Sequence, residues 1–323
     1  MKISKMKSLG DYMELDLRQG RHYHDDAIKL NTGRCCLQYI VKAKQYKKIY
    51  VPYYTCCTVT DSLKACNVEY EFYSINESLE PVKEYKLKSD EAFLYTNYYG
   101  LTHAAVVKLL NIYGAKLIVD NTMAFYEKPL QGIDTFYSAR KFFGVSDGAY
   151  LYTDTQLKED LEQDFSFDRM IHLLKRIDIS IEEAHIDFVA NEKKLQNQPI
   201  KKMSKLTERI LMGIDYEAIK NRRIENYLYL DSALKNENLL KIDYPNGAVP
   251  LLYPFFSYEN HLRERLIGNK IYVGVYFPNI YEWCTEDQLE YKLTKYVMTL
   301  PVNQRHDVED MAQIVKLIMN GFY

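Results

Sequence analysis

Long apolar runs are missing from this chain of 323 residues, and their absence argues against a membrane or secreted protein. The N-terminal stretch MKISKMKSLGDYMELDL contains lysines but no apolar segment behind them, so it does not resemble a signal peptide. The longest apolar runs, such as the one around Leu117–Val119, are too short to span a bilayer. We therefore expect a cytoplasmic protein without a membrane partner.

An excess of charge is also missing, because the formal net charge is only -2. Proteins that bind nucleic acids present a basic surface to the phosphates, so we expect no nucleic-acid partner. The G-x-G-x-x-G pattern does not follow the first predicted strand, which argues against a Rossmann-type dehydrogenase. The P-loop pattern is absent as well.

Metal-ligand spacing is the third feature that the sequence lacks. It has six cysteines but no C-x-x-C pair, and in a reducing cytosol we expect these cysteines to be small buried side chains. His22 and His24 would need two further ligands, so we interpret them as part of a polar N-terminal surface. We predict no metal site.

Short apolar runs alternate with helical patterns through the first half of the chain. A helix with an apolar face of Ala104, Val107, Leu110 and Tyr113 is predicted over His103–Tyr113, and another over Thr55–Cys66. The alternation predicts an α/β fold, with a mainly parallel sheet covered by helices on both faces. The predicted strands are Ile49–Tyr54, Glu69–Ser74, Ala92–Thr96, Lys116–Asp120, Thr135–Ser138 and Ala149–Tyr152.

The second half of the chain is more helical and more polar. A charged helical pattern covers Gln156–Ile177, a polar loop-rich segment is predicted over Ser180–Met203, and a clear amphipathic helix covers Tyr216–Leu234. A smaller α+β unit follows, with strands near Val249–Phe256 and Ile271–Tyr276 and a last helix over Val308–Met319. We predict a large domain over residues 1–215 and a small C-terminal domain over residues 216–323.

An acid and a lysine end two neighbouring predicted strands. Asp120 ends one strand, and Lys141 follows 21 residues later, just beyond the next strand. Ligands of such sheets bind at the carboxyl ends of the strands. Pyridoxal phosphate (PLP) needs this pair, because a lysine forms a Schiff base with its aldehyde and an acid keeps its pyridine nitrogen protonated. Each residue alone has an ordinary alternative, a turn residue for Asp120 and a surface charge for Lys141.

A phosphate-binding turn accompanies this pair. Asn31–Leu37 resembles a turn that opens a helix, where the amides of Gly33, Arg34 and Cys35 can hold a phosphate at the positive helix end. The hydroxyl of Ser138, three residues before Lys141, can bind the same phosphate. The order of these pieces along the chain is more informative than any one of them.

A series of short motifs follows along the chain: Thr32–Arg34, Val51–Thr55, Thr96–Gly100, Asp120–Phe125, Ser138–Lys141, Asp147–Gly148, Met203–Leu206, Asn221–Tyr227 and Leu300–Val302. Their order resembles that of the DegT-type sugar aminotransferases, which have fold type I of the PLP-dependent enzymes, with a mainly parallel seven-stranded sheet. By this resemblance the protein would be a homodimer that transfers an amino group, usually from glutamate, to a keto sugar attached to a nucleotide. Lys141 would hold PLP, Asp120 would pair with its pyridinium, and Ser138 with the Gly33–Cys35 amides would bind its phosphate. Polysaccharide or modified-sugar biosynthesis would be the setting.

Two cofactor-binding positions depart from the family pattern. Met123 stands where members have a glutamine, and Cys56 stands where members often have an aromatic that stacks on the ring. A thioether cannot donate a hydrogen bond as an amide can, and Asn97 and Asn121 are candidate substitutes. The alternatives are therefore a family member that binds PLP or a sugar nucleotide without transamination, and a PLP-dependent sugar dehydratase, against which the retained Lys141 argues.

Overall fold

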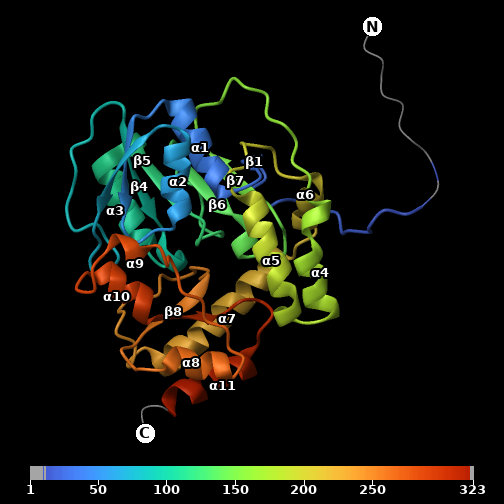
Figure 1. Cartoon of the computed structure of the whole chain (residues 1–323), viewed down its shortest axis with the longest axis vertical. Coiled ribbons are helices and arrows are strands. Elements are labelled where there is room, and N and C mark those ends of the chain that lie inside the picture. Colours follow the sequence, from blue (N-terminus) through green and yellow to red (C-terminus); the bar gives the residue numbers. More distant parts are fainter. Residues whose placement is uncertain (1–9, 11, 321–323) are drawn as a thin grey trace.

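A seven-stranded sheet forms the centre of the protein (Figure 1), whose computed structural model describes residue 10 and residues 12–320. The strand order is β1-β7-β6-β5-β4-β2-β3, and only β7 runs against its neighbours. This confirms the predicted α/β class and the mainly parallel sheet, although β1 was not predicted. The strands are β1 (Ile28–Leu30), β2 (Lys48–Pro52), β3 (Glu69–Tyr73), β4 (Glu91–Thr96), β5 (Leu117–Asn121), β6 (Asp134–Ser138) and β7 (Ala149–Tyr152).

Helices cover both faces of this sheet, as predicted. α1 (Gly33–Lys44) and α2 (Cys57–Ala65) share one apolar core with the β-strand side chains of that face, and α3 (His103–Tyr113) packs into the core on the other face. Every residue of β4, β5 and β6 is buried, because both sides of these central strands are covered.

The predicted apolar face of α3 was wrong except at Tyr113. The helix buries Ala105, Val106, Leu109 and Tyr113, whereas Val107 is 39% exposed. Apolar residues lie on more than one side of this helix, so their spacing alone could not select the side that meets the sheet.

The segment after the sheet contains more helix than we predicted. It forms α4 (Ile171–Asp178), α5 (Ile181–Leu195) and α6 (Lys205–Met212), while residues 156–166 are not helical. The loop predicted over Ser180–Met203 was therefore wrong. The Ser180 hydroxyl accepts a hydrogen bond from Glu183 N at 3.1 Å and caps α5, whose polar composition hid its helical pattern.

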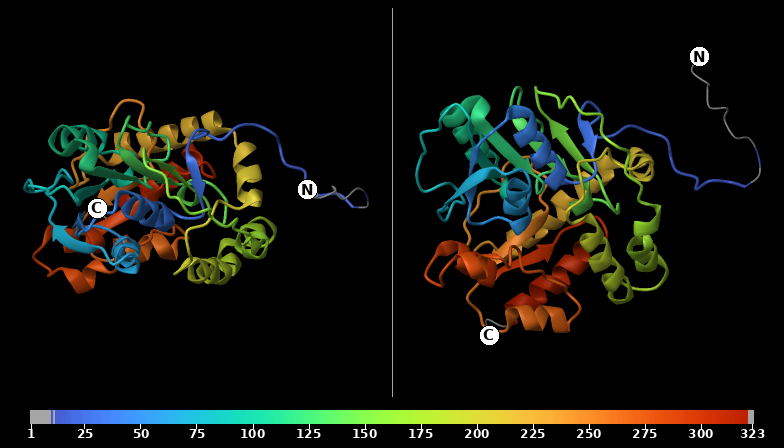
Figure 2. Two further views of the ribbon diagram at one scale, coloured as in Figure 1. Left: turned by 90° about the horizontal axis from the view of Figure 1, so that it is seen from above. Right: turned by 45° about the horizontal axis from the view of Figure 1, so that its top comes forward.

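The C-terminal elements pack below the sheet in Figures 1 and 2, with α7 beside them. Helices α7 and α11 have the predicted bounds. β8 and β9 form a two-stranded antiparallel sheet. The boundary between residues 215 and 216 stays a prediction. The elements are α7 (Tyr216–Leu234), β8 (Leu252–Phe256), α8 (Leu262–Gly268), α9 (Ile280–Trp283), α10 (Leu289–Tyr296), β9 (Val297–Pro301) and α11 (Val308–Met319).

The strand predicted over Ile271–Tyr276 was wrong. The Arg263 guanidinium donates hydrogen bonds to Val273 O at 3.2 Å and Gly274 O at 3.0 Å, and to Val297 O at 3.0 Å on β9. The arginine side chain thus joins this segment to the small sheet, where a strand would have used backbone hydrogen bonds.

The two N-terminal histidines are buried, so their assignment to a polar surface was wrong. His24 is 2% exposed, and its Nε2 lies 2.7 Å from Phe125 O. His22 Nδ1 lies 2.7 Å from the Tyr150 hydroxyl. Burial lowers the pKa of both imidazoles to about 4, so both side chains are neutral core groups near pH 7.

The described residues contain no cluster of three or more side chains that could hold a metal ion. None of their helices combines the length and the apolar character that crossing a bilayer requires.

Candidate active site

A cavity of about 190 Å³ lies at the carboxyl ends of the central strands and contains the predicted acid and lysine. Asp120 comes from β5, while Lys141 follows β6 in a short 3-10 turn, Ala139–Lys141. Because β5 and β6 are parallel neighbours, their carboxyl ends lie side by side. Asp120 and Lys141 therefore line the same cavity although they are 21 positions apart. Further predicted residues that line it are Gly33, Arg34, Cys56, Met123 and Ser138.

Thr122 connects the acid and the lysine. Its amide donates to Asp120 Oδ1 at 2.8 Å, and its hydroxyl accepts from Lys141 Nζ at 3.1 Å. We had assigned no role to Thr122. Aspartate side chains often accept a hydrogen bond from the backbone amide two residues later in the chain. This spacing was the feature of the sequence from which the contact between Asp120 and Thr122 could have been predicted.

Burial shifts both ionisable groups toward their neutral forms. Burial raises the pKa of Asp120, against the opposing charge of Lys141. Burial also lowers the pKa of Lys141, helped by Arg140, while Asp120 and Cys56 act in the other direction. The Lys141 side chain is nevertheless accessible to solvent, because it projects into the cavity. A lowered pKa increases the fraction of the amine that is neutral. The neutral amine is the form that attacks an electrophilic ligand.

The start of α1 forms another wall of the cavity. Thr32 caps the helix, and its hydroxyl accepts from Cys35 N at 3.2 Å. This bond occupies the Cys35 amide, and Cys35 does not line the cavity. The Gly33 and Arg34 residues do line it, and a Cβ atom at Gly33 would stand only 3.3 Å from Thr122 Cγ2. The absence of a side chain at Gly33 thus lets the helix start approach the residue beside Asp120.

Two arginines in this wall share one glutamate that the sequence did not reveal. Glu192 of α5 forms an ion pair with Arg140 and lies 4.0 Å from Arg34 Nη2. Burial, followed by the charge of Arg34, lowers the pKa of Arg140 to about 10. Because α5 lies far from the motifs in sequence and was predicted as loop, only the folded chain shows this cluster.

The two departures from the family pattern also face the cavity. Met123 is 1% exposed and places a thioether in the wall. Cys56 precedes α2, and hydrogen bonds from Cys57 and Thr58, with the charge of Lys141, lower its pKa. The lowered pKa favours the thiolate form of Cys56 beside Lys141.

The C-terminal part closes the cavity with Phe277, which has a positive φ of 58°. Asn279 Oδ1 accepts from Cys57 N at 3.1 Å, and its Nδ2 donates to Thr55 O at 2.9 Å. These bonds hold the Phe277 segment against the start of α2. Phe277 is therefore both a core residue and part of the cavity wall.

The two candidate substitutes for the missing glutamine, Asn97 and Asn121, do not line the cavity. The Asn97 side chain donates to Asn121 Oδ1 at 3.2 Å and accepts from Thr102 N at 3.1 Å. Asn97 therefore organises the loop after β4.

No protein-family model and no curated protein sequence matches the chain. Solved structures do match. DesV of S. venezuelae is 13% identical, with 91% of this chain and 84% of DesV covered at a TM-score of 0.61. A DegT/DnrJ/EryC1/StrS aminotransferase from Brucella abortus is 14% identical, with 91% and 85% covered at 0.58. NtdA of Bacillus subtilis, solved with bound PMP, is 13% identical, with 91% and 73% covered at 0.63.

The chain has the fold of the DegT-type sugar aminotransferases. This confirms the fold expected from the motifs, and the match covers both the sheet and the C-terminal elements. At this identity the comparison concerns the fold alone, so the chemistry of the site is argued from its own residues.

Proposed function

We propose that the chain is a PLP-dependent aminotransferase that moves an amino group from glutamate to a nucleotide-linked keto sugar, in polysaccharide or modified-sugar biosynthesis. The observation that carries the proposal is the shared cavity of Lys141 and Asp120, with Thr122 hydrogen-bonded to both. A lysine of lowered pKa, a buried carboxylate and a helix start with a glycine in the cavity wall meet there.

The residues of the cavity fit PLP at three points. The Gly33 and Arg34 amides, with the Ser138 hydroxyl, would hold the phosphate, and Asp120 would hold the pyridine nitrogen. Lys141 would hold the aldehyde carbon through its amine. When bound, PLP supplies an electron sink for the substrate carbon that loses a proton.

The chain's own groups suit the remaining steps. The lowered pKa of Lys141 keeps a larger fraction of its amine neutral, so that it can accept the proton that leaves the substrate carbon. Thr122 orients that amine through its hydroxyl. Phe277 and Met123 supply apolar walls that exclude water from the reacting groups.

A second candidate function is binding of PLP or a sugar nucleotide without transamination. The thioether of Met123 cannot donate a hydrogen bond, and the lowered pKa of Cys56 favours a negative charge beside Lys141. Both observations favour an altered reaction or its loss.

A cytoplasmic homodimer completes the proposal. Apolar side chains are exposed on the α4–α5 hairpin, including Ile177 at 81% and Ile186 at 73%. A surface of this kind is typical of a subunit contact. Sedimentation equilibrium of the chain and of its Ile177→Asp variant tests it, because a dimer through this face should become monomeric in the variant.

The visible absorption spectrum of the chain with added PLP, before and after glutamate, tests the catalytic proposal. A visible absorption band would be the signature of lysine-bound PLP, because the imine is conjugated with the pyridine ring. Loss of this band with glutamate would establish the half-reaction. A band that ignores glutamate would favour the second candidate. No band would refute the cofactor assignment.

A further inference from the structure

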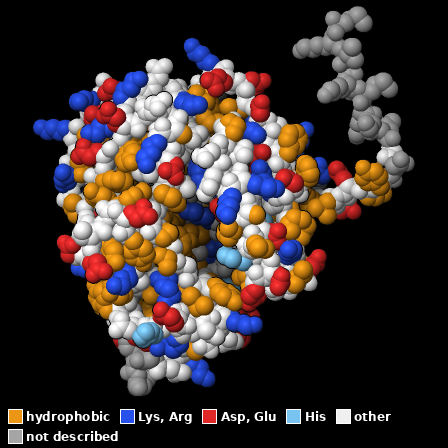
Figure 3. Space-filling model, in the orientation of Figure 1, with side chains coloured by type: hydrophobic (Ala, Val, Ile, Leu, Met, Phe, Trp, Pro, Cys, Tyr) orange, Lys and Arg blue, Asp and Glu red, His pale blue; other side chains and the backbone are white. Residues whose placement is uncertain are grey.

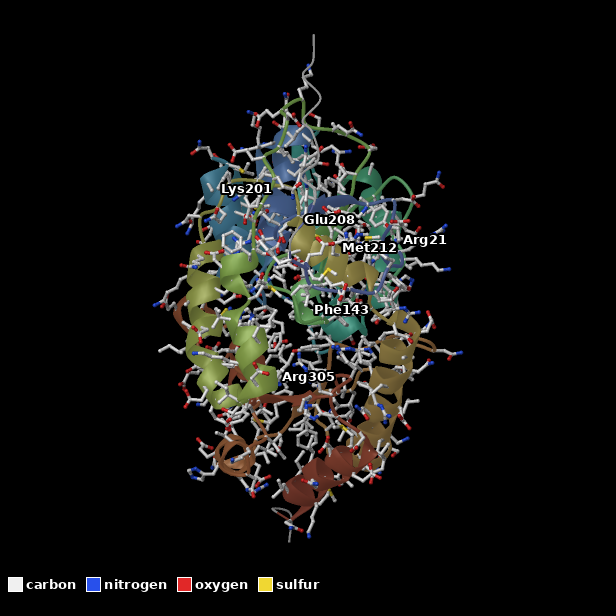
Figure 4. All side chains as sticks on the ribbon, turned by 90° about the vertical axis from the view of Figure 1, so that its right-hand side faces the viewer. Arg21, Phe143, Lys201, Glu208, Met212 and Arg305 are labelled. Carbon is white, nitrogen blue, oxygen red and sulfur yellow. The ribbon has the colours of Figure 1, made fainter. Side chains whose placement is uncertain are left out.

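A second and larger cavity, of about 310 Å³, lies on the other side of Lys141. Its walls are the turn after Lys141, the α4–α5 hairpin, α7 and the loop before α11. Figure 3 shows a hollow in this face of the molecule with Lys and Arg side chains inside it. Figure 4 labels Phe143 and Arg305, which both line this cavity, between the α4–α5 hairpin and α7.

The lining of this cavity is strongly basic. It includes Arg140, Arg176, Arg223 and Arg305, together with His172 and His185, and no Asp or Glu is among its described lining residues. Of the four arginines, only Arg140 has an ion pair within the described part of the chain, and that partner is Glu192.

Several of these basic groups lack a partner for their polar atoms. Arg223 is 1% exposed, and its Nη atoms donate to the carbonyls of Pro250, Leu251 and Phe142. Its Nε atom has no hydrogen-bond partner among the described residues, and the same holds for Nδ1 of His172, which is 7% exposed. Buried donors of this kind cost stability unless a ligand meets them.

The charges also repel one another. Burial and then the charge of Arg305 lower the pKa of Arg176, and burial lowers the pKa of Arg305 itself. Uncompensated like charges around one space are expected where an anion completes the site.

We propose that this cavity binds the end of the substrate that carries at least two negative oxyanion charges. Guanidinium groups bind phosphate and carboxylate oxygens through paired hydrogen bonds, so the diphosphate of a nucleotide and a dicarboxylic amino donor share this chemistry. Lys141 and Arg140 line both cavities, so a ligand anchored at Arg176 and Arg305 extends to the Lys141 amine. Its role as a substrate site rests on the proposed function.

Gly144 leaves room in the wall beside Arg305. A Cβ atom at Gly144 would stand 3.8 Å from Arg305 Nη2 and 3.8 Å from Leu173 Cδ2. The backbone tolerates a side chain here, because φ of Gly144 is not in the left-handed region. Gly144→Leu would therefore fill the cavity without removing a charge.

Isothermal titration calorimetry of the full chain with pyrophosphate, and separately with glutarate, tests the proposal. We expect saturable binding of at least one probe. Binding of pyrophosphate would favour the diphosphate of a nucleotide as the ligand, and binding of glutarate would favour a dicarboxylic amino donor. Arg176→Gln and Arg305→Gln should each weaken it about tenfold or more, because each removes a charge-assisted contact. Gly144→Leu should weaken it by filling the space. Arg222→Gln is the matched control, since Arg222 pairs with Glu225 and does not line the cavity.

Pyrophosphate can also enter the first cavity, so Ser138→Ala is titrated as well. Binding that Ser138→Ala weakens and the arginine variants do not would overturn the proposal. So would the absence of binding for both probes. Because calorimetry does not depend on PLP, a chain that binds the anion but gives no visible band would refute the proposed function and leave the anion site standing. Circular dichroism confirms that each variant is folded.

Discussion

Asp147 is a buried carboxylate between Lys141 and β7 that accepts three hydrogen bonds. It is 0% exposed, and it accepts hydrogen bonds from Ser204 N at 2.8 Å, from the Ser204 hydroxyl at 2.7 Å and from the Thr207 hydroxyl at 2.5 Å. These bonds connect the start of α6 to the turn before β7. The next amide, Gly148 N, donates to Asn31 O at 2.6 Å, beside the start of α1.

Asp147→Ala removes the acceptor of three buried donors at once. A hydrogen bond to a charged group contributes about 1.5–3 kcal/mol, and neighbouring contributions are not additive. We therefore expect the variant to lose about 3–5 kcal/mol of unfolding free energy, similar to the loss of one partner of a buried ion pair. The variant also removes the carboxylate at the N-terminus of α6, where the helix dipole favours a negative charge.

Urea unfolding followed by far-ultraviolet circular dichroism measures this loss. Asp154→Ala is the control, because Asp154 is 58% exposed and its ion pair with Lys44 should contribute no more than about 1 kcal/mol. If Asp147→Ala costs as little as Asp154→Ala, the three donors find other acceptors in the variant, and the reasoning fails.

Three further predictions concern the site and its surroundings. Lys141→Ala should abolish the visible band of bound PLP while circular dichroism shows an unchanged fold, and a variant with the wild-type spectrum would disprove the assignment of Lys141. Asp120→Ala should weaken PLP binding far more than Asp134→Ala, since Asp134 is buried beside Lys44 away from the cavity; equal and mild effects in a PLP titration would exclude the pyridine role. His24 has a pKa lowered from 6.5 to about 4, so the unfolded chain binds its proton more readily, and its contribution to stability is full above pH 6.5 and falls toward pH 4. Between pH 7 and pH 4 the His24→Gln variant should lose roughly 3 kcal/mol less unfolding free energy than the wild type. Unfolding of both proteins at the two pH values measures this difference, and equal losses would contradict the prediction.

Much of the fold could be predicted from local patterns. Helix α7 and helix α11 were predicted to the residue, and the predicted strands β2 to β7 differ from the observed ones by two residues or fewer at either end. These segments have strong apolar periodicity or fully buried runs, and such patterns depend on burial rather than on a particular partner. The meeting of Asp120 and Lys141 in one cavity could be predicted as well, because both end neighbouring parallel strands.

The wrong predictions share one physical cause, which is that a distant partner decided the local structure. α5 is polar and lacks a wide apolar stripe, yet Asn191 Nδ2 donates to Ser146 O at 3.1 Å and fixes it beside the Lys141 turn. The segment Ile271–Tyr276 has strand-like residues, but Arg263 binds its carbonyls. His24 looks like a surface residue until Phe125 and Tyr152 surround it.

The sequence by itself therefore determined the α/β class, the main strands and helices, and the residues that the strand ends bring to one site. Only the tertiary structure decided which side of α3 is buried, where Glu192 and Thr122 lie, and that four arginines and two histidines from separate segments surround a second cavity. The physical reason is that periodicity reports burial along one element, whereas charge compensation and hydrogen-bond pairing depend on groups that the fold brings together from far along the chain.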